Sequence, residues 1–253
     1  MLHIVTLSGN SKRFTDKGFP HKALCQVDGK SVISHFVECF YNFETYPSIF
    51  LCRNEDLLTT NLEHEIKNVA KNSTVIGIET NNLGPVFSIS RIFDNIPDNM
   101  PVLITYIDSI QKIDLNELTE RFRGCDGGIT LHDFSNPHWR TNKSFCLVSH
   151  PKGKNVASIV EKFDFANFDF SSSNCGGSSG SYYFRNGKIL KSMFSRLMNN
   201  GVRVNNEYYV TQALGEMVSL GMRVECEYYP YVCLGIPEDV QDYRYWIDWF
   251  KIK

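Results

Sequence analysis

The sequence predicts an α/β fold built on a doubly wound, mixed and mainly parallel sheet, and two observations support this class. Through residues 1–125, short segments rich in β-branched residues alternate with segments whose apolar residues recur at helical spacing. From Gly127 onward several strand-like segments follow one another, which is typical of antiparallel strands. No long linker divides the chain, so we expect one domain, 1–253, with halves at 1–125 and 126–253.

The first half supplies the parallel part of the expected sheet. Strands are predicted at 4–7, 48–51, 74–78 and 102–107, and helices at 31–41, 57–72 and 86–96. Because the connections are short, right-handed crossovers should bring these strands side by side. A ligand is then expected at their carboxyl ends, where the loop after the first strand lies.

The second half supplies the antiparallel part. Strands are predicted within 127–134, 145–151, 155–163, 181–184 and 223–228, and helices at 189–198 and 209–220. The segment from Ser171 to Gly180 holds five Ser and three Gly in ten residues. This composition offers little apolar area for packing, so we predict a mobile loop that orders over a ligand, with a plain surface connection as the alternative.

Composition narrows the function classes. A net charge of −2 without a dominant basic stripe argues against binding to nucleic acid or a membrane surface. The N-terminal apolar stretch is too short for a secretory signal, and no apolar run approaches the length of a membrane span. The eight Cys lie far apart without a C-x-x-C, which favours reduced, buried thiols in a cytoplasmic protein over zinc or disulfides.

The polar turn after the first strand has the chemistry of a phosphate-binding loop. Gly9 allows close approach of an anion, and Ser8 and Ser11 add hydroxyl donors. Cationic side chains follow at Lys12, Arg13 and Lys22. The pattern matches neither of the common glycine-rich phosphate motifs, so a strand-to-helix turn with surface Lys and Arg remains the alternative.

The same segment resembles the opening of the nucleoside-triphosphate transferase family, the sugar-1-phosphate nucleotidylyltransferases of surface-polysaccharide synthesis. Its members carry G-x-G-x-R-[FL] after the first strand and P-K-x-L about ten residues later. Here the positions read Gly9, Ser11, Arg13 and Phe14, then Pro20-His21-Lys22-Ala23-Leu24. Two departures are visible: Ser11 replaces the second Gly, and His21 is inserted between Pro20 and Lys22.

Later segments extend the resemblance over nearly the whole chain, in the family's order. They are Asn82–Pro85, Asp108 at the end of the fourth strand, Glu161–Lys162, Gly180–Phe184, Asn206–Thr211 and Leu234–Asp239. The resemblance implies a Rossmann-like, GT-A-like fold with a nucleotide-binding half (1–125) and an acceptor-binding half (126–253).

The resemblance also implies a function and its residues. The expected enzyme transfers NMP from an NTP to a phosphorylated sugar or polyol, releases pyrophosphate and serves capsule or surface-polysaccharide synthesis. The residues implied in catalysis are Arg13, Lys22 and Asp108, with Asp108 also a ligand of Mg²⁺. Those implied in nucleotide binding are Leu7, Ser8, Gly9, Asn10, Ser11, Lys12, Asn82 and Gly84. Those implied in acceptor binding are Glu161, Lys162, Gly180 and Glu207. A homo-oligomer is left open.

This chemistry brings two dianionic groups together, so cations must offset their repulsion. A Mg²⁺ ion that bridges the phosphates would supply most of the positive charge, and the Asp108 carboxylate would be one of its ligands. Arg13 would fork across the β- and γ-phosphates, and Lys22 would act as a point charge on the α-phosphate. No general base is needed, because the attacking phosphate is already ionised at pH 7.

One departure concerns the metal. Many relatives carry a second metal-binding Asp two residues before a late Gly-Thr, and here that position is Cys233, a poor Mg²⁺ ligand. Three interpretations follow: another oxygen ligand, from Asn205, Asn206 or Glu207, completes the site; the metal is held mainly by Asp108 and the triphosphate; or the chain has lost catalysis.

Two other function classes stay open. A glycosyltransferase of similar topology would need an Asp-x-Asp after the fourth strand, where this chain has Asp108-Ser109-Ile110. A nucleotide-binding regulatory protein is suggested by Ser11, Cys233 and by Gln212 in place of a family Asp.

The loop Asn136–Arg140 is interpreted equally as an aromatic and cationic clamp on the ligand or as a hydrophobic plug.

Overall fold

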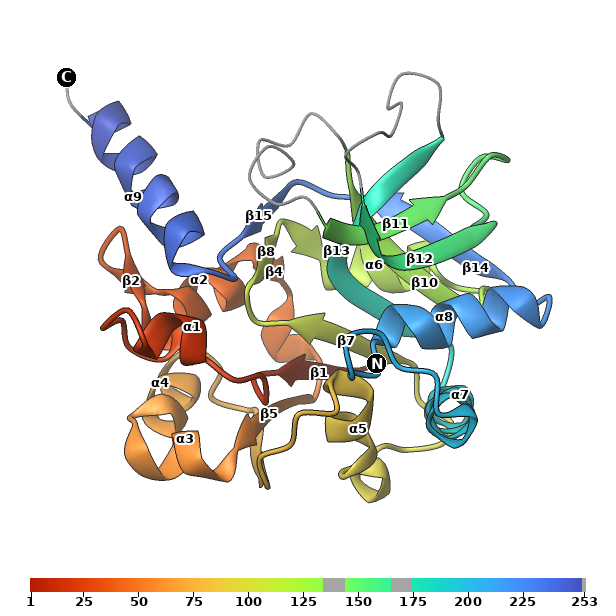
Figure 1. Ribbon diagram of the computed structural model, residues 1–253, viewed down its shortest axis with the longest axis horizontal. Helices are drawn as coiled ribbons and strands as arrows, with labels where there is room; N and C mark the ends of the chain where they lie inside the picture. The colour runs from red at the N-terminus through yellow and green to blue at the C-terminus, as the bar shows by residue number, and fades with distance from the viewer. Residues whose placement is uncertain (134–143, 165–173, 252–253) are drawn as a thin grey trace.

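The computed structural model describes residues 1–133, 144–164 and 174–251. A mixed sheet of nine strands forms its centre (Figure 1), in the order β12-β11-β13-β7-β1-β5-β6, with β10 paired to both β13 and β14. Helices cover both faces of this sheet. The α/β class predicted from the sequence is confirmed, and the clamp or plug predicted at Asn136–Arg140 lies outside the described residues.

The parallel part is built by strands of the first half. They are β1 (Leu2–Thr6), β5 (Ser48–Arg53), β6 (Thr74–Ile78) and β7 (Val102–Tyr106). β1 runs parallel to both β5 and β7, and β5 runs parallel to β6. All five residues of β1 are buried, as expected for a central parallel strand with both faces covered.

The second half continues the same sheet. Its strands are β10 (Gly127–His132), β11 (Ser144–Ser149), β12 (Ser158–Asp164), β13 (Cys175–Phe184) and β14 (Val224–Tyr228). β13 runs antiparallel to β7, to β10 and to β11, so it joins the two halves. The antiparallel prediction is therefore correct for these strands, whereas β14 adds to β10 in parallel.

The helices are α1 (Lys12–Thr15), α2 (Val32–Cys39), α3 (Asn54–Thr59), α4 (Leu62–Val69), α5 (Pro85–Ser90), α6 (Leu115–Arg121), α7 (Gly187–Asn200), α8 (Val210–Ser219) and α9 (Pro237–Lys251). Those that pack against the central sheet form two layers, one on each face. Ile4 packs in one core cluster with residues of α5, α7 and α8, while its neighbour Val5 packs in another with residues of α2, α4 and α6. The period-two alternation of a strand thus serves both faces.

Short elements complete the chain. They are β2 (Gln26–Val27), β3 (Lys30–Ser31), β4 (Phe40–Tyr41), β8 (Ser109–Gln111), β9 (Ile113–Asp114), β15 (Tyr231–Cys233) and the 3₁₀ turns η1 (Lys22–Leu24), η2 (Phe43–Thr45) and η3 (Phe93–Asn95). The helix predicted at 57–72 is in fact α3 followed by α4. The break has a local cause, because the Thr60 hydroxyl donates to the Asp56 carbonyl and accepts from the Leu62 amide. The helix predicted at 86–96 likewise stops at Ser90 and continues as η3.

The prediction of a flexible loop up to Gly180 is wrong for its described part. Residues from Cys175 onward form the long strand β13, and most of them are buried. The small polar side chains are satisfied inside the sheet: the Ser179 hydroxyl donates to Oε1 of Gln111 at 2.9 Å and lies within hydrogen-bond distance, 2.8 Å, of the Thr130 hydroxyl. Composition misled because serines can be buried once cross-strand partners take up their hydrogen bonds.

The C-terminal helix α9 projects away from the body of the molecule (Figure 1). Val240 anchors its first turns in a small core with Phe14 and Leu234. Its outer part exposes aromatic side chains at Tyr245, Trp246, Trp249 and Phe250. Within the described ranges, the search for a helix of sufficient length and apolarity to span a bilayer finds none.

Candidate functional site

A cavity of about 360 Å³ lies at the carboxyl ends of β1 and β7, the edge where the sequence places a ligand. Thr6 ends β1, Tyr106 ends β7, and Asp108 follows two residues later. The predicted residues that line this cavity are Ser8, Gly9, Asn10, Arg13, Lys22, Asn82, Gly84, Asp108, Lys162 and Glu207. Segments scattered from residue 8 to residue 207 thus meet in one place.

The loop after β1 brings Arg13 to this cavity through a buried anchor. α1 is only one turn long, and Phe14 at its centre is buried against Val32 and Leu234. With Phe14 fixed in the core, the adjacent Arg13 lies at the cavity wall. The Asn10 side chain accepts from the Lys12 amide at 2.8 Å and closes the loop.

Three predicted nucleotide residues do not lie at the cavity wall. Leu7 is fully buried in the core, and the Lys12 side chain is exposed. Ser11 is buried, and its hydroxyl has no hydrogen-bond partner within the described part of the chain. A nucleotide contact by any of the three therefore stays a prediction.

Lys22 and Asp108 form an ion pair at the centre of the cavity. Lys22 lies in the turn η1, and its Nζ is 2.8 Å from Oδ2 of Asp108. Burial alone would raise the pKa of the Asp108 carboxyl, but the Lys22 ammonium brings that pKa below its ordinary value. Asp108 is therefore a carboxylate, the form that a cation or a metal requires.

Two motifs more than a hundred residues apart build the base of the cavity together. The Tyr208 amide donates to the Leu83 carbonyl at 2.8 Å, and the Val86 amide donates to the Tyr208 carbonyl at 3.2 Å. Gly84 has a φ of 87°, and a Cβ there would lie 2.8 Å from the Tyr208 carbonyl oxygen. Only glycine permits this approach, so Gly84 serves to dock the turn that carries Asn82 onto the turn that carries Glu207.

A second cavity, of about 200 Å³, adjoins the first. Predicted acceptor residues Glu161, Lys162 and Gly180 line it. Five residues line both cavities: Arg13, Tyr106, Asp108, Lys162 and Tyr209. The predicted nucleotide and acceptor residues therefore face a common wall that carries two cations and one carboxylate.

A β-bulge explains how two consecutive strand residues reach the same cavity. Between Phe145 and Leu147 of β11, the pairing with β12 slips, so that one residue of β11 faces both Glu161 and Lys162. Lys162 has a φ of 54°, a conformation that non-glycine residues rarely adopt. Its ammonium lies 5.3 Å from the centre of the Tyr209 ring, and Glu161 accepts a hydrogen bond from the Thr211 hydroxyl.

Gly180 marks a second irregularity, in the pairing of β10 with β13. Its φ is 89°, and a Cβ at this position would lie 2.3 Å from Oγ of Ser109. The register shifts between Ile129 and Leu131 on the partner strand. The bend sets Gly180 against the segment that follows Asp108, at the wall of the second cavity.

Asp239 is a carboxylate that the sequence motif contained but to which we assigned no role. It lines the second cavity beside Asp108 and Cys233, and its Oδ2 accepts from the Ile236 amide at 3.2 Å. Burial raises the pKa of Asp239 to about 6; the charge of Asp108 acts in the same direction, against hydrogen bonds from the Ile236 and Gly235 amides. Burial also raises the pKa of the Cys233 thiol to about 12, so Cys233 is a neutral neighbour.

Of the three residues considered as alternative metal ligands, Glu207 lines the first cavity, while Asn205 and Asn206 adopt left-handed turn conformations.

Other residues at the walls had no sequence signal that we recognised. Thr6, Asn81, Ser88 and Tyr106 line the first cavity, as does Tyr209, which lies in the Asn206–Thr211 motif but was given no role. Thr6 and Tyr106 end central strands, so their strand-end position is the signal that could have identified them. Gln212, at the position of a family Asp, accepts from the Tyr209 amide at 2.9 Å and thereby caps α8.

Comparison with known proteins gives matches in structure only. No family model matches the sequence, and no curated protein matches it. A nucleoside-diphosphate-sugar pyrophosphorylase from Vibrio cholerae RC9 is similar with a TM-score of 0.77, at 16% identity over 97% of this chain and 100% of the other. A UDP-glucose pyrophosphorylase in complex with UDP-glucose is similar with a TM-score of 0.72, at 15% identity over 99% of both chains. HddC from Yersinia pseudotuberculosis in complex with GMP-PN is similar with a TM-score of 0.65, at 17% identity over 97% of this chain and 99% of the other.

These similarities extend over whole chains, so the protein has the same fold as these three proteins. At such identities the likeness establishes the fold, and activity has to be argued from the residues of the site.

Proposed function

We propose that this protein is a nucleotidyltransferase that transfers NMP from an NTP to a phosphorylated sugar or polyol and releases pyrophosphate. The observation that carries the proposal is the wall shared by the two cavities, where Arg13, Asp108 and Lys162 lie together. A triphosphate in the first cavity and a phosphorylated acceptor in the second would meet at this wall. Its two cations answer the main electrostatic problem of the reaction, which is the approach of two anions.

The reaction requires positioning more than proton transfer. An oxygen of the acceptor phosphate attacks the α-phosphorus in line, and the bond to the β-phosphate breaks so that pyrophosphate leaves. Lys22 would stabilise the charge that develops on the α-phosphate, and Arg13 would hold the leaving phosphates by a forked contact. Lys162 would hold the acceptor phosphate, since it alone of the two lysines lines both cavities.

The oxygen donors of the site fit Mg²⁺. The carboxylates of Asp108 and Asp239 line the same cavity, and carboxylate oxygen is a preferred ligand of this ion. Within the described ranges, no group of three or more His, Cys, Asp or Glu could hold a metal unaided. Substrate phosphates would therefore complete the coordination, as is usual for Mg²⁺, and the bound ion would supply charge neutralisation of the phosphates.

We extend the proposal to sugar-nucleotide synthesis for capsule or surface polysaccharide in the cytoplasm. The sequence resemblance supports the pathway. The eight cysteines, all free and most of them buried, support a reducing compartment.

A screen of four NTPs against a panel of phosphosugars and phosphopolyols tests the proposal by pyrophosphate release. Pyrophosphate release that requires both an NTP and an acceptor supports the proposal. Arg13→Ala should then lose activity, whereas the control Arg123→Ala, at an exposed position, should keep it. Sugar transfer from a nucleotide-sugar without pyrophosphate would identify a glycosyltransferase instead. Nucleotide binding without turnover of any pair would identify a regulatory protein.

A further inference from the structure

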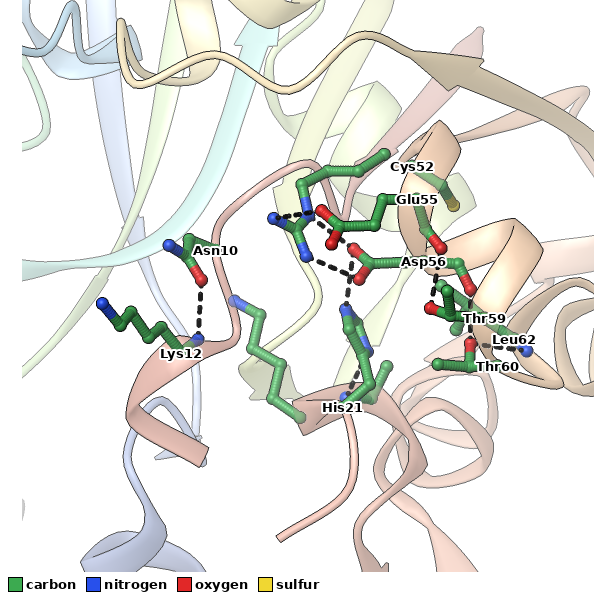
Figure 2. A network of polar contacts seen from close by, with 12 residues as sticks. Asn10, Lys12, His21, Cys52, Glu55, Asp56, Thr59, Thr60 and Leu62 are labelled. Atoms are coloured by element: carbon green, nitrogen blue, oxygen red, sulfur yellow. Dashed lines mark hydrogen bonds and ion pairs between the residues drawn. The ribbon is translucent and has the colours of Figure 1, made fainter. Parts of the chain in front are cut away.

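A buried polar cluster lies around His21 and Asp56, next in the chain to Lys22 (Figure 2). It starts at Arg53, at the end of β5, whose guanidinium donates two hydrogen bonds of 2.7 Å to the Asp56 carboxylate. Oδ2 of Asp56 lies 3.6 Å from Nε2 of His21, which is too far for a hydrogen bond, and Nε2 has no hydrogen-bond partner among the described residues. The His21 and Asp56 side chains are 2% and 7% exposed, so neither is a surface group.

The same imidazole reaches the turn of Lys22 with its other nitrogen. Nδ1 of His21 accepts from the Ala23 amide at 3.3 Å, which makes His21 the N-cap of η1, the turn Lys22–Leu24. Figure 2 shows the ring between the two partners, with Asp56 on one side and the turn on the other. The ring therefore lies between the carboxylate and the backbone that carries Lys22, and its hydrogen bond is on the backbone side.

Charge and tautomer are fixed by these contacts. Burial lowers the pKa of His21 to about 4, against a smaller raising effect of Asp56, so the ring is neutral at pH 7. Because Nδ1 accepts from an amide, the ring proton must be on Nε2, the nitrogen that faces Asp56. Arg53 neutralises Asp56, so the network buries a compensated ion pair rather than a lone charge.

We propose that His21 is a positioning residue for Lys22, acting through the hydrogen bond that its Nδ1 accepts from the Ala23 amide, while its Nε2 faces the Arg53–Asp56 pair. His21 is the extra residue between Pro20 and the lysine in the motif described above, so this chain has a longer turn to fix at that point. Tethering the Ala23 amide sets the start of η1, and this directs Nζ of Lys22 to its place 2.8 Å from Asp108. The proposal rests on the proposed function, because it assigns His21 a part in that same reaction.

A double-mutant cycle of His21→Phe with Lys22→Ala, together with the conservative variant His21→Asn, tests it. His21→Phe keeps an aromatic ring and removes both nitrogens, while His21→Asn keeps an acceptor near the position of Nδ1. We expect His21→Phe to lower kcat about 10- to 100-fold with KM for NTP nearly unchanged, since small misplacement of a catalytic group has this effect. His21→Asn should recover most of the loss. In a Lys22→Ala background His21→Phe should change kcat less than twofold, because its effect passes through Lys22.

The control for general damage is His64→Gln, at an exposed position of α4, which should leave kcat unchanged. If the fold-decreases in kcat caused by His21→Phe and Lys22→Ala multiply in the double variant, the proposal is overturned, because the histidine would then act independently of Lys22. Failure of His21→Asn to improve on His21→Phe would also overturn it.

A readout independent of turnover separates this proposal from the proposed function. Hydrogen exchange should show a protected Ala23 amide in the wild type and in His21→Asn, and an unprotected one in His21→Phe. In His21→Phe the NMR order parameter of the Lys22 Cε should fall as well. If the wild type releases no pyrophosphate with any pair, the proposed function fails. If Ala23 stays protected and Lys22 stays ordered in His21→Phe, the positioning proposal fails.

Discussion

Nζ of Lys22 lies 2.8 Å from Oδ2 of Asp108, although 86 residues separate them in sequence. The two side chains are 15% and 20% exposed, so water screens the pair only in part. If a triphosphate occupies this cavity as proposed, the pair would open and the lysine would exchange the carboxylate for a phosphate. Before that, the pair keeps the Asp108 carboxyl ionised, because Lys22 lowers its pKa.

Lys22→Ala should lower turnover by about 10²- to 10³-fold, as expected for the loss of one preorganised donor to the transition state. Steady-state pyrophosphate release measures this. Lys30→Ala is the matched control, because Lys30 is an exposed lysine that pairs with Glu38. Near-normal turnover in folded Lys22→Ala protein would remove Lys22 from the mechanism.

Asp108→Asn should abolish most of the stabilisation that NTP and Mg²⁺ together give the protein, since the amide keeps the shape and loses the charge. Thermal melts with and without NTP and Mg²⁺ measure it. Asp98→Asn, which changes an exposed carboxylate paired with Lys191, should keep the full shift. An undiminished shift in Asp108→Asn would place the metal elsewhere.

Gly180→Ala should reduce the free energy of unfolding by about 2 to 4 kcal/mol, from left-handed backbone strain and a steric clash. The added Cβ would lie 2.3 Å from Oγ of Ser109 at a φ of 89°. Gly9→Ala is the matched control for stability, because a Cβ at Gly9 meets no atom within 4 Å. Urea denaturation compares the two; equal stabilities would show that the bend of β13 tolerates a side chain.

His3 should make the protein less stable as the pH falls below about 6.5. Burial lowers its pKa in the folded protein to about 3, so between these values the unfolded chain binds a proton that the folded chain does not. The contribution of neutral His3 to the free energy of unfolding is complete above the ordinary pKa of about 6.5. It is lost as the pH falls toward the pKa of about 3 in the folded protein.

The expected slope from His3 is about 1.4 kcal/mol per pH unit between pH 6 and pH 4. Unfolding free energies of the wild type and His3→Gln at several pH values measure it, and the variant should lose this part of the slope. The contribution of buried His21 has the same sign and remains in both proteins. The control is His64→Gln, at an exposed position. A His3→Gln slope identical to that of the wild type would contradict the prediction.

The sequence indicated the parallel core because its signals are local. The strand at 74–78 was predicted with its observed bounds, and β1, β5 and β7 within two residues at either end. A continuous apolar run between turn residues is typical of a strand buried on both faces. The strand-end loop and Asp108 could be found for the same reason, since a ligand site follows from topology.

Composition failed where partners from distant strands decide the structure. The Ser- and Gly-rich segment before Ser181 has no local reason to be a strand, yet Gln111 and Thr130 satisfy its polar groups inside the sheet. Likewise, strict alternation would send Glu161 and Lys162 to opposite faces, and only a slip in their pairing with β11 brings both to one cavity.

By itself, the sequence determined the α/β class, the order of most elements and the set of motif residues, because these depend on local periodicity and residue type. The tertiary structure alone decided which of those residues meet. It paired Lys22 with Asp108, set Asp239 beside Cys233 and placed His21 between Asp56 and the Lys22 turn. Distances between residues far apart in the chain depend on how the whole sheet packs, and no local pattern encodes them.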